Sequence, residues 1–130
     1  MVCKAYCFEN LILTCPLCDT PGGEVLWQDD FCRVILKRHI KEMTDLTADE
    51  RTRLMDVVWK TEQAVRDVMS PDKINIASLG NVVPHLHWHV IPRFENDRHY
   101  PNTIWGESKR DAKLAHQPHL MDSLRAAFTA

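Results

Sequence analysis

The chain of 130 residues has no long apolar run, no large excess of one charge, no internal repeat and no low-complexity tract. No stretch approaches the roughly 20 apolar residues that a membrane span requires, and the apolar run at 11–15 is too short for an export signal. The net charge of −2 gives no basic surface that would argue for a nucleic-acid or membrane partner. These absences predict a cytoplasmic protein with a single domain.

The cysteine count is odd, which fits a disulfide framework poorly and favours a reducing compartment. The five cysteines are Cys3, Cys7, Cys15, Cys18 and Cys32. The C-x-x-C step formed by Cys15 and Cys18 is typical of half a zinc site or of a redox pair. Turn residues at 21–23 argue against the helix that lowers the thiol pKa in redox pairs. Zinc is therefore favoured over redox chemistry, and two ordinary surface thiols stay open as the alternative.

Three short segments carry the β-branched, aromatic or alternating residues that are typical of strands. They are residues 24–27, 31–36 and 73–79. In the last segment Ile74 and Ile76 point to one side of the predicted strand, while Asn75 and Ala77 point to the other.

Capping and periodicity predict two helices. Thr47 and Glu50 form a capping box at the start of the first helix. Apolar residues then recur at three- and four-residue steps over 54–68, and a Ser-Pro step stops the pattern at 70–71. This pattern predicts an amphipathic helix of about six turns. Weaker periodicity predicts a C-terminal helix over residues 111–127.

The segment His85-Leu86-His87-Trp88-His89-Val90-Ile91 alternates histidines with large apolar residues. Gly80 and Asn81 are interpreted as the turn that leads into it. Because side chains in a strand have a period of two, the three histidines are predicted to lie in a row on one face, about 6.6 Å apart. Neutral imidazole transfers protons, attacks electrophiles and binds metals near pH 7, so the row predicts a functional site.

Residues 81–93 contain the pattern His-φ-His-φ-His-φ-φ, with φ apolar, at His85–Ile91, and the sequence resembles the histidine triad (HIT) superfamily. Residues 37–40 resemble the family's Lys-x-His step, and residues 45–47 resemble the start of its long helix. The likeness covers roughly residues 13–106. The stretch through Trp105 is similar to bacterial members that are called diadenosine polyphosphate hydrolase-like.

The resemblance implies a single α+β HIT domain over residues 1–130, with an antiparallel sheet of about five strands, one long helix and a C-terminal helix. Residues 31–36 follow Asp29 and Asp30 directly, so about one strand and its turn are missing relative to most members. The carboxylate that holds ribose in those members has no clear counterpart here, and Asp29 or Asp30 is the substitute. Members usually pair as homodimers, which closes the open edge of so short a sheet.

The resemblance also implies a function, namely cleavage at the α-phosphate of a nucleotide conjugate of the dinucleoside polyphosphate or nucleoside phosphoramidate type. His87 would attack phosphorus and form a covalent nucleotidyl intermediate that water hydrolyses. His85 would orient His87, directly or through its main-chain carbonyl, and His89 would contact the phosphate and assist the leaving group. Asn75 and Asn81 would bind the nucleotide and its phosphate. No organic cofactor is expected.

Some bacterial members hold a structural zinc ion through a C-x-x-C pair, the Lys-x-His histidine and the first histidine of the triad. The residues here at those positions are Cys15, Cys18, His39 and His85. Two other functions stay open. One is a metal-dependent enzyme whose triad holds catalytic zinc, which the resemblance argues against because His87 must stay unligated. The other is a non-enzymatic protein that binds nucleotides or a partner and keeps the fold.

Overall fold

The computed structural model describes residues 25–28, 31–36, 38–113 and 119–129. The elements are, in chain order, β1 (Val25–Gln28), β2 (Phe31–Ile35), the 3-10 helix η1 (Met43–Asp45), α1 (Ala48–Met69), β3 (Lys73–Ala77), β4 (His87–Arg93) and α2 (Leu120–Thr129). None of the helices in these ranges is both long enough and apolar enough to cross a membrane.

The four strands form one antiparallel sheet in the order β1-β2-β4-β3. β4 therefore lies between β2 and β3. Arg33 of β2 and Ala77 of β3 are both paired with His89 of β4. This register places residues from two strands beside the last histidine of the triad.

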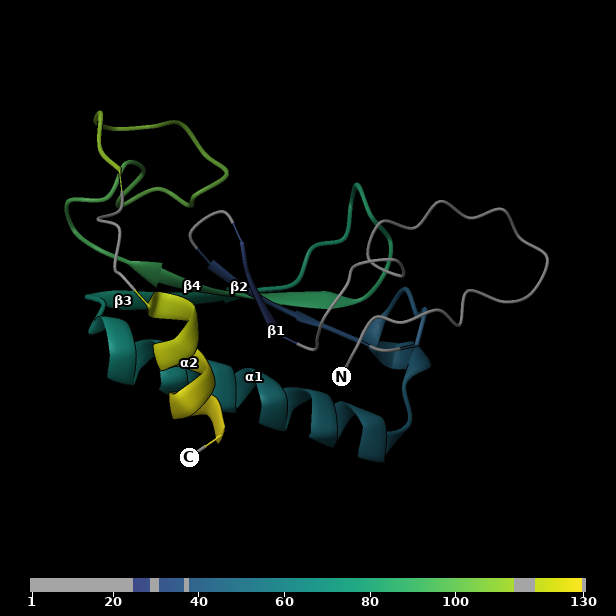
Figure 1. The fold of residues 1–130 in the computed structure, drawn as a ribbon. Helices are drawn as coiled ribbons and strands as arrows, with labels where there is room; N and C mark the ends of the chain where they lie inside the picture. Colours follow the sequence, from purple (N-terminus) through teal and green to yellow (C-terminus); the bar gives the residue numbers. More distant parts are fainter. Residues whose placement is uncertain (1–24, 29–30, 37, 114–118, 130) are drawn as a thin grey trace.

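The sheet separates two layers (Figure 1). α1 covers one face, and the loops 78–86 and 94–113 rise on the other. The core between sheet and helix is apolar: Val34, Val58 and Val90 are fully buried and belong to one cluster. Burying side chains of this kind contributes roughly 1.5–3 kcal/mol each. The α+β class and the antiparallel sheet are confirmed, with four strands in the described part of the chain.

The predicted long helix is confirmed, and its ends show why it forms there. Thr47 Oγ1 accepts a hydrogen bond from the main-chain N–H of Glu50 at 3.2 Å, and Glu50 Oε2 accepts one from the N–H of Thr47 at 2.7 Å. These two bonds satisfy donors that the first helical turn leaves without a partner. At the other end Ser70 takes a left-handed conformation, with φ of 48°, and the helix stops before Pro71.

The loop before β4 differs from the sequence prediction. The predicted turn at Gly80 and Asn81 is part of a connection that spans residues 78–86, and β4 begins at His87 instead of His85. The main-chain N–H of Leu86 donates to Ile40 O at 2.7 Å, so Leu86 pairs with the segment after β2 and not with β3.

The predicted C-terminal helix begins later than residue 111. Residues 111–113 are not helical, and residues 114–118 lie outside the described residues. α2 begins at Leu120, directly after His119, which has a φ of 62° that no right-handed helix contains. The predicted start was wrong because the weak periodicity was followed across Pro118, and a proline disfavours the helical conformation in the residue before it.

The sheet has an exposed edge that suits the predicted homodimer. Among the described residues β3 pairs with β4 on one side only, and Ile76 at this edge is 39% exposed. We predict that sedimentation at micromolar concentration gives twice the 15.1 kDa of one chain. Ile76→Lys should shift the protein toward monomer, because a charge on an edge strand opposes strand pairing. Leu79→Lys, a matched change in the exposed loop, should not. A monomeric wild-type protein would contradict the prediction.

Candidate active site

β4 presents His87 and His89 on the sheet face opposite α1. Val34, Trp88 and Val90 pack toward the helix, so the alternating histidines face the other way. The two imidazole rings lie 4.9 Å apart between centroids, with an angle of 73° between their planes. This pair is the part of the predicted histidine row that the strand itself provides.

The hydrogen bonds of the pair fix which ring nitrogen carries the proton. His87 Nδ1 lies 2.5 Å from His85 O, and His89 Nδ1 lies 3.1 Å from Ala77 O. A carbonyl oxygen only accepts, so each Nδ1 is the donor. The Nε2 atom of each neutral ring therefore carries a lone pair. Such an atom is a competent nucleophile or proton acceptor at neutral pH.

The surroundings keep both rings neutral. Burial is the main cause that lowers the pKa of His87, and burial lowers the pKa of His89 to about 4. The positive charge of Arg33, which is paired with His89 across the sheet, lowers both values further. The same charge makes this face favourable for an anionic group such as phosphate.

His85 departs from the predicted row. It precedes β4 and is fully buried, and its ring packs against His39 with centroids 4.9 Å apart. His85 Nε2 donates to Leu36 O at 2.8 Å, so its Nδ1 is the unprotonated nitrogen, and that atom lies 3.0 Å from His39 Nδ1. His85 meets His87 through its main-chain carbonyl, one of the two routes that the resemblance implied.

Two of the four predicted zinc ligands are among the residues that the structure describes, and two are not. Cys15 and Cys18 lie outside the described residues, whereas His39 and His85 lie side by side. Within the described ranges no group of three or more histidine, cysteine, aspartate or glutamate side chains is arranged to hold a metal ion. The two facing Nδ1 atoms fit half of a site with two thiolates and two imidazoles.

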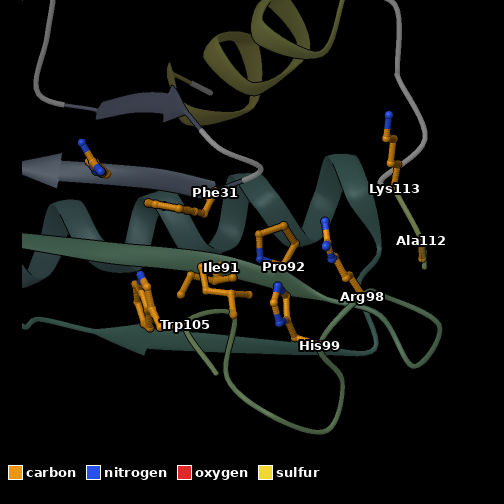
Figure 2. A pocket seen from close by; sticks show the side chains of 10 residues that line it. Phe31, Ile91, Pro92, Arg98, His99, Trp105, Ala112 and Lys113 are labelled. Atoms are coloured by element: carbon orange, nitrogen blue, oxygen red, sulfur yellow. The ribbon is translucent and has the colours of Figure 1, made fainter. Parts of the chain in front are cut away.

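A pocket of about 670 Å³ opens beside the histidine pair. Phe31 and Trp105 line it, with ring centroids 6.4 Å apart, and both rings contact His89 at centroid distances of 5.1 and 5.0 Å. Figure 2 shows this aromatic pair toward one end of the pocket and Arg98 and Lys113 toward the other. Arg33 also lines the pocket, and no carboxylate does among the described residues. An aromatic and cationic pocket suits a nucleobase with attached phosphate.

A second hollow of about 490 Å³ reaches His85 and His87 from the other end of the triad. Its remaining walls come from Leu86, Trp88 and residues 41–44 and 78–80. His87 therefore borders this second hollow, while His89 contacts the aromatic rings that line the first pocket.

The two predicted nucleotide-binding asparagines lie in different surroundings. Asn75 is paired with Ile91 across the sheet, beside the pocket, and its Oδ1 accepts a hydrogen bond from Arg93 at 2.7 Å. Asn81 is exposed in the loop 78–86. Asp29 and Asp30, the predicted substitutes for a ribose-binding carboxylate, lie outside the described residues.

Sequence reasoning missed several residues of the site. Phe31 and Arg33 were taken only as strand residues, and Arg93 and Trp105 only as parts of a family-like stretch. The alternation of β2 places Phe31 and Arg33 on one face, but the sequence does not say that this face is the one with the histidines. The position of Trp105 depends on a loop without regular structure, for which no periodicity exists.

The HIT domain family model matches residues 28–96. The chain belongs to the HIT family. A bis(5'-nucleosyl)-tetraphosphatase of Schizosaccharomyces pombe is 34% identical over 88 residues, which cover 63% of this chain and 48% of that protein. A protein of Mycobacterium tuberculosis named AP-4-A phosphorylase is 30% identical over 79 residues, covering 56% of this chain and 40% of that protein. This HIT chain thus matches less than half of the length of either relative.

Solved structures show the same fold. A histidine triad protein from Bradyrhizobium japonicum superposes with a TM-score of 0.64 at 29% identity, covering 81% of this chain and 78% of that one. A Zn-bound histidine triad family protein from Mycobacterium smegmatis shares the fold with a TM-score of 0.52 at 23% identity, over 82% of this chain and 74% of that one.

The carboxylate of Asp97, in the loop that carries Trp105, should make the free energy of unfolding depend on pH. Burial alone would raise the pKa of Asp97, but hydrogen bonds from Arg93 and from main-chain N–H groups outweigh it and lower the pKa to about 2. A lowered carboxyl pKa stabilises the fold above its unfolded value, near 3.8, and this stabilisation is lost as pH falls toward 2. Asp97→Asn should therefore lower the free energy of unfolding by about 1 kcal/mol at pH 7, and the deficit should shrink between pH 4 and 2.

Urea unfolding at several pH values measures this difference. Asp67→Asn, on the exposed side of α1, is the matched control and should show no such trend. A deficit of Asp97→Asn that stays constant down to pH 2 would show that the carboxylate charge is not what stabilises the loop.

Proposed function

We propose that the chain is a nucleotide-cleaving enzyme that acts at the α-phosphate of a nucleotide conjugate, with His87 as the nucleophile. The observation that carries the proposal is the tautomer of His87. Its Nδ1–H is held by His85 O, which leaves the lone pair on Nε2. The neighbouring His89 contacts the two aromatic rings of the pocket that Arg33, Arg98 and Lys113 also line. The names of the matched relatives, a tetraphosphatase and a phosphorylase, support the same substrate class.

The step balances as two displacements at one phosphorus. Nε2 of His87 forms a bond to the α-phosphorus while the bond from that phosphorus to the leaving oxygen or nitrogen breaks, and the leaving group takes the electron pair. Water then attacks the same phosphorus and passes a proton to solvent, while the bond from phosphorus to Nε2 breaks and its electron pair returns to the neutral His87 ring. Splitting one displacement into two lowers each barrier. If inorganic phosphate takes the place of water in the second step, the same site works as a phosphorylase.

The neighbours of His87 have distinct tasks in this proposal. His89, 4.9 Å away between ring centroids, contacts the transferred phosphate. A bound phosphate anion raises the pKa of the His89 ring, which then donates a proton to the leaving group from Nε2. Arg33 contributes positive potential where negative charge increases in the transition state. Phe31 and Trp105 are placed to hold the base.

We also propose that His39 and His85 share a structural zinc ion with Cys15 and Cys18. The support is the 3.0 Å approach of two Nδ1 atoms, of which the one on His85 is unprotonated. Two thiolates and two imidazoles would give zinc a closed shell that activates no water. His85 would then be held in place, and with it the carbonyl that orients His87.

The nucleophile is tested by His87→Asn. Turnover of diadenosine tetraphosphate should fall by at least about 10³-fold, because the nucleophile acts only in the transition state. Affinity for AMP, measured by calorimetry, should stay within a few-fold of wild type. His119→Asn changes a histidine whose side chain is 83% exposed and should leave both values unchanged. Activity of His87→Asn within tenfold of wild type would contradict the assignment.

The metal is tested by elemental analysis of protein purified without chelator. We expect about one zinc per chain, lost together with several degrees of melting temperature when Cys15 and Cys18 are both replaced by serine. Replacing Cys3 and Cys7 instead is the matched control and should keep the metal. Negligible zinc in the wild type, with an unchanged melting temperature in the Cys15/Cys18 variant, would rule the site out.

A further inference from the structure

Arg93 is the most buried charged side chain that the structure describes, with 3% of its surface exposed. Its guanidinium donates to both carboxylate oxygens of Asp97, at 2.8 and 3.2 Å, to Asn75 Oδ1 at 2.7 Å and to Asn102 O at 2.6 Å. A buried charge requires such compensation, and the fork of a guanidinium meets a carboxylate with two parallel bonds. The bonds join the end of β4 to β3 and to the loop that follows β4.

The loop 94–113 depends on this ion pair for its shape. It contains no helix or strand, so its main chain lacks the repeating hydrogen bonds of those elements. Asp97 replaces part of them by accepting hydrogen bonds from three main-chain N–H groups, those of Phe94, His99 and Tyr100. Arg110 returns to the same point and donates to Asp97 O and Tyr100 O.

Arg93 thereby connects to two groups near His87 and His89, namely the loop segment before Trp105 and the side chain of Asn75. Asn102, whose carbonyl Arg93 holds, is three residues before Trp105, and the ring of Trp105 packs against His89. Asn75 is fixed as well. A guanidinium has no acceptor, so the amide must turn its oxygen toward Arg93, and its Nδ2 donors then point elsewhere.

We propose that Arg93 is a positioning residue for nucleotide recognition. It holds Trp105 over His89 as one wall of the pocket, and it turns Asn75 so that the amide presents hydrogen-bond donors to the nucleotide. The proposal rests on the proposed function in assigning the pocket to a nucleotide. It adds that a buried residue without contact to the substrate sets the affinity of that pocket.

The test is Arg93→Lys, which keeps the positive charge but cannot bind Asp97, Asn75 and Asn102 at once. We expect the affinity for AMP to fall and the KM for diadenosine tetraphosphate to rise, each about tenfold, with a smaller change in kcat. In a background that carries Trp105→Ala and Asn75→Ala, the same substitution should change both values less than twofold, because the groups through which it acts are gone. Equal effects in both backgrounds would overturn the proposal.

A spectroscopic measurement tests the position of Trp105 without any turnover. The chain has four tryptophans, so the emission of Trp105 is taken as the difference between each protein and its Trp105→Phe variant. In Arg93→Lys this emission should shift to longer wavelength and be quenched more strongly by acrylamide, because the Trp105 ring becomes more exposed to solvent. Arg53→Lys, the same change at an exposed position on α1, should leave it unchanged. If Arg93→Lys does not fold, Asp97→Asn breaks the same ion pair and is measured in its place.

These outcomes separate the positioning role from the nucleophile. Retained turnover in His87→Asn would remove the nucleophile assignment, while AMP affinity and Trp105 emission would still decide the role of Arg93. Unchanged AMP affinity together with unchanged Trp105 emission in a folded Arg93→Lys protein would overturn the positioning role, whatever the fate of His87.

Discussion

The hydrogen bond from His87 Nδ1 to the main-chain carbonyl of His85 is the interaction on which the proposed chemistry depends. It fixes the tautomer of His87, so that Nε2 carries the lone pair, and it fixes the direction in which the ring projects. The bond exists because the chain leaves the regular ladder just before β4. Leu86 pairs with Ile40, and His85 turns its ring toward His39. Because β4 begins only at His87, the ring of His85 lies apart from the ring of the proposed nucleophile.

Charge is distributed unevenly around this bond. The imidazoles of His87 and His89 are held neutral by burial, while Arg33 is paired with His89 from β2 and Arg93 lies at the end of β4. The charge of Arg33 lowers the pKa of both imidazole rings, whereas Arg93 donates hydrogen bonds to Asp97, Asn75 and Asn102. We propose that the charge of Arg33 favours a bound phosphate and that Arg93 holds the groups around it in place.

The features that the sequence predicted are those that depend on neighbours in the chain. The capping box of Thr47 and Glu50 located the start of α1, and the period-two pattern located the strand with His87 and His89. The ring position of His85 was not predictable in the same way, because His85 Nε2 donates to Leu36 O and the N–H of Leu86 donates to Ile40 O, both more than forty positions away in sequence. Trp105 was missed for a related reason: it lies in a loop without regular structure, whose main chain is held by hydrogen bonds to Arg93 and Asp97 and not by a periodic pattern.

The central claim is that His87 becomes covalently bonded to the nucleotide, and mass spectrometry of peptides from the quenched protein tests it most directly. The protein is mixed with diadenosine tetraphosphate, quenched within milliseconds to seconds under alkaline denaturing conditions that preserve phosphohistidine, and digested. The account predicts a mass increase of one adenylyl group on the peptide that contains His87, absent from His87→Asn. Rapid turnover with no such adduct at any quench time, or an adduct on a different residue, would contradict it.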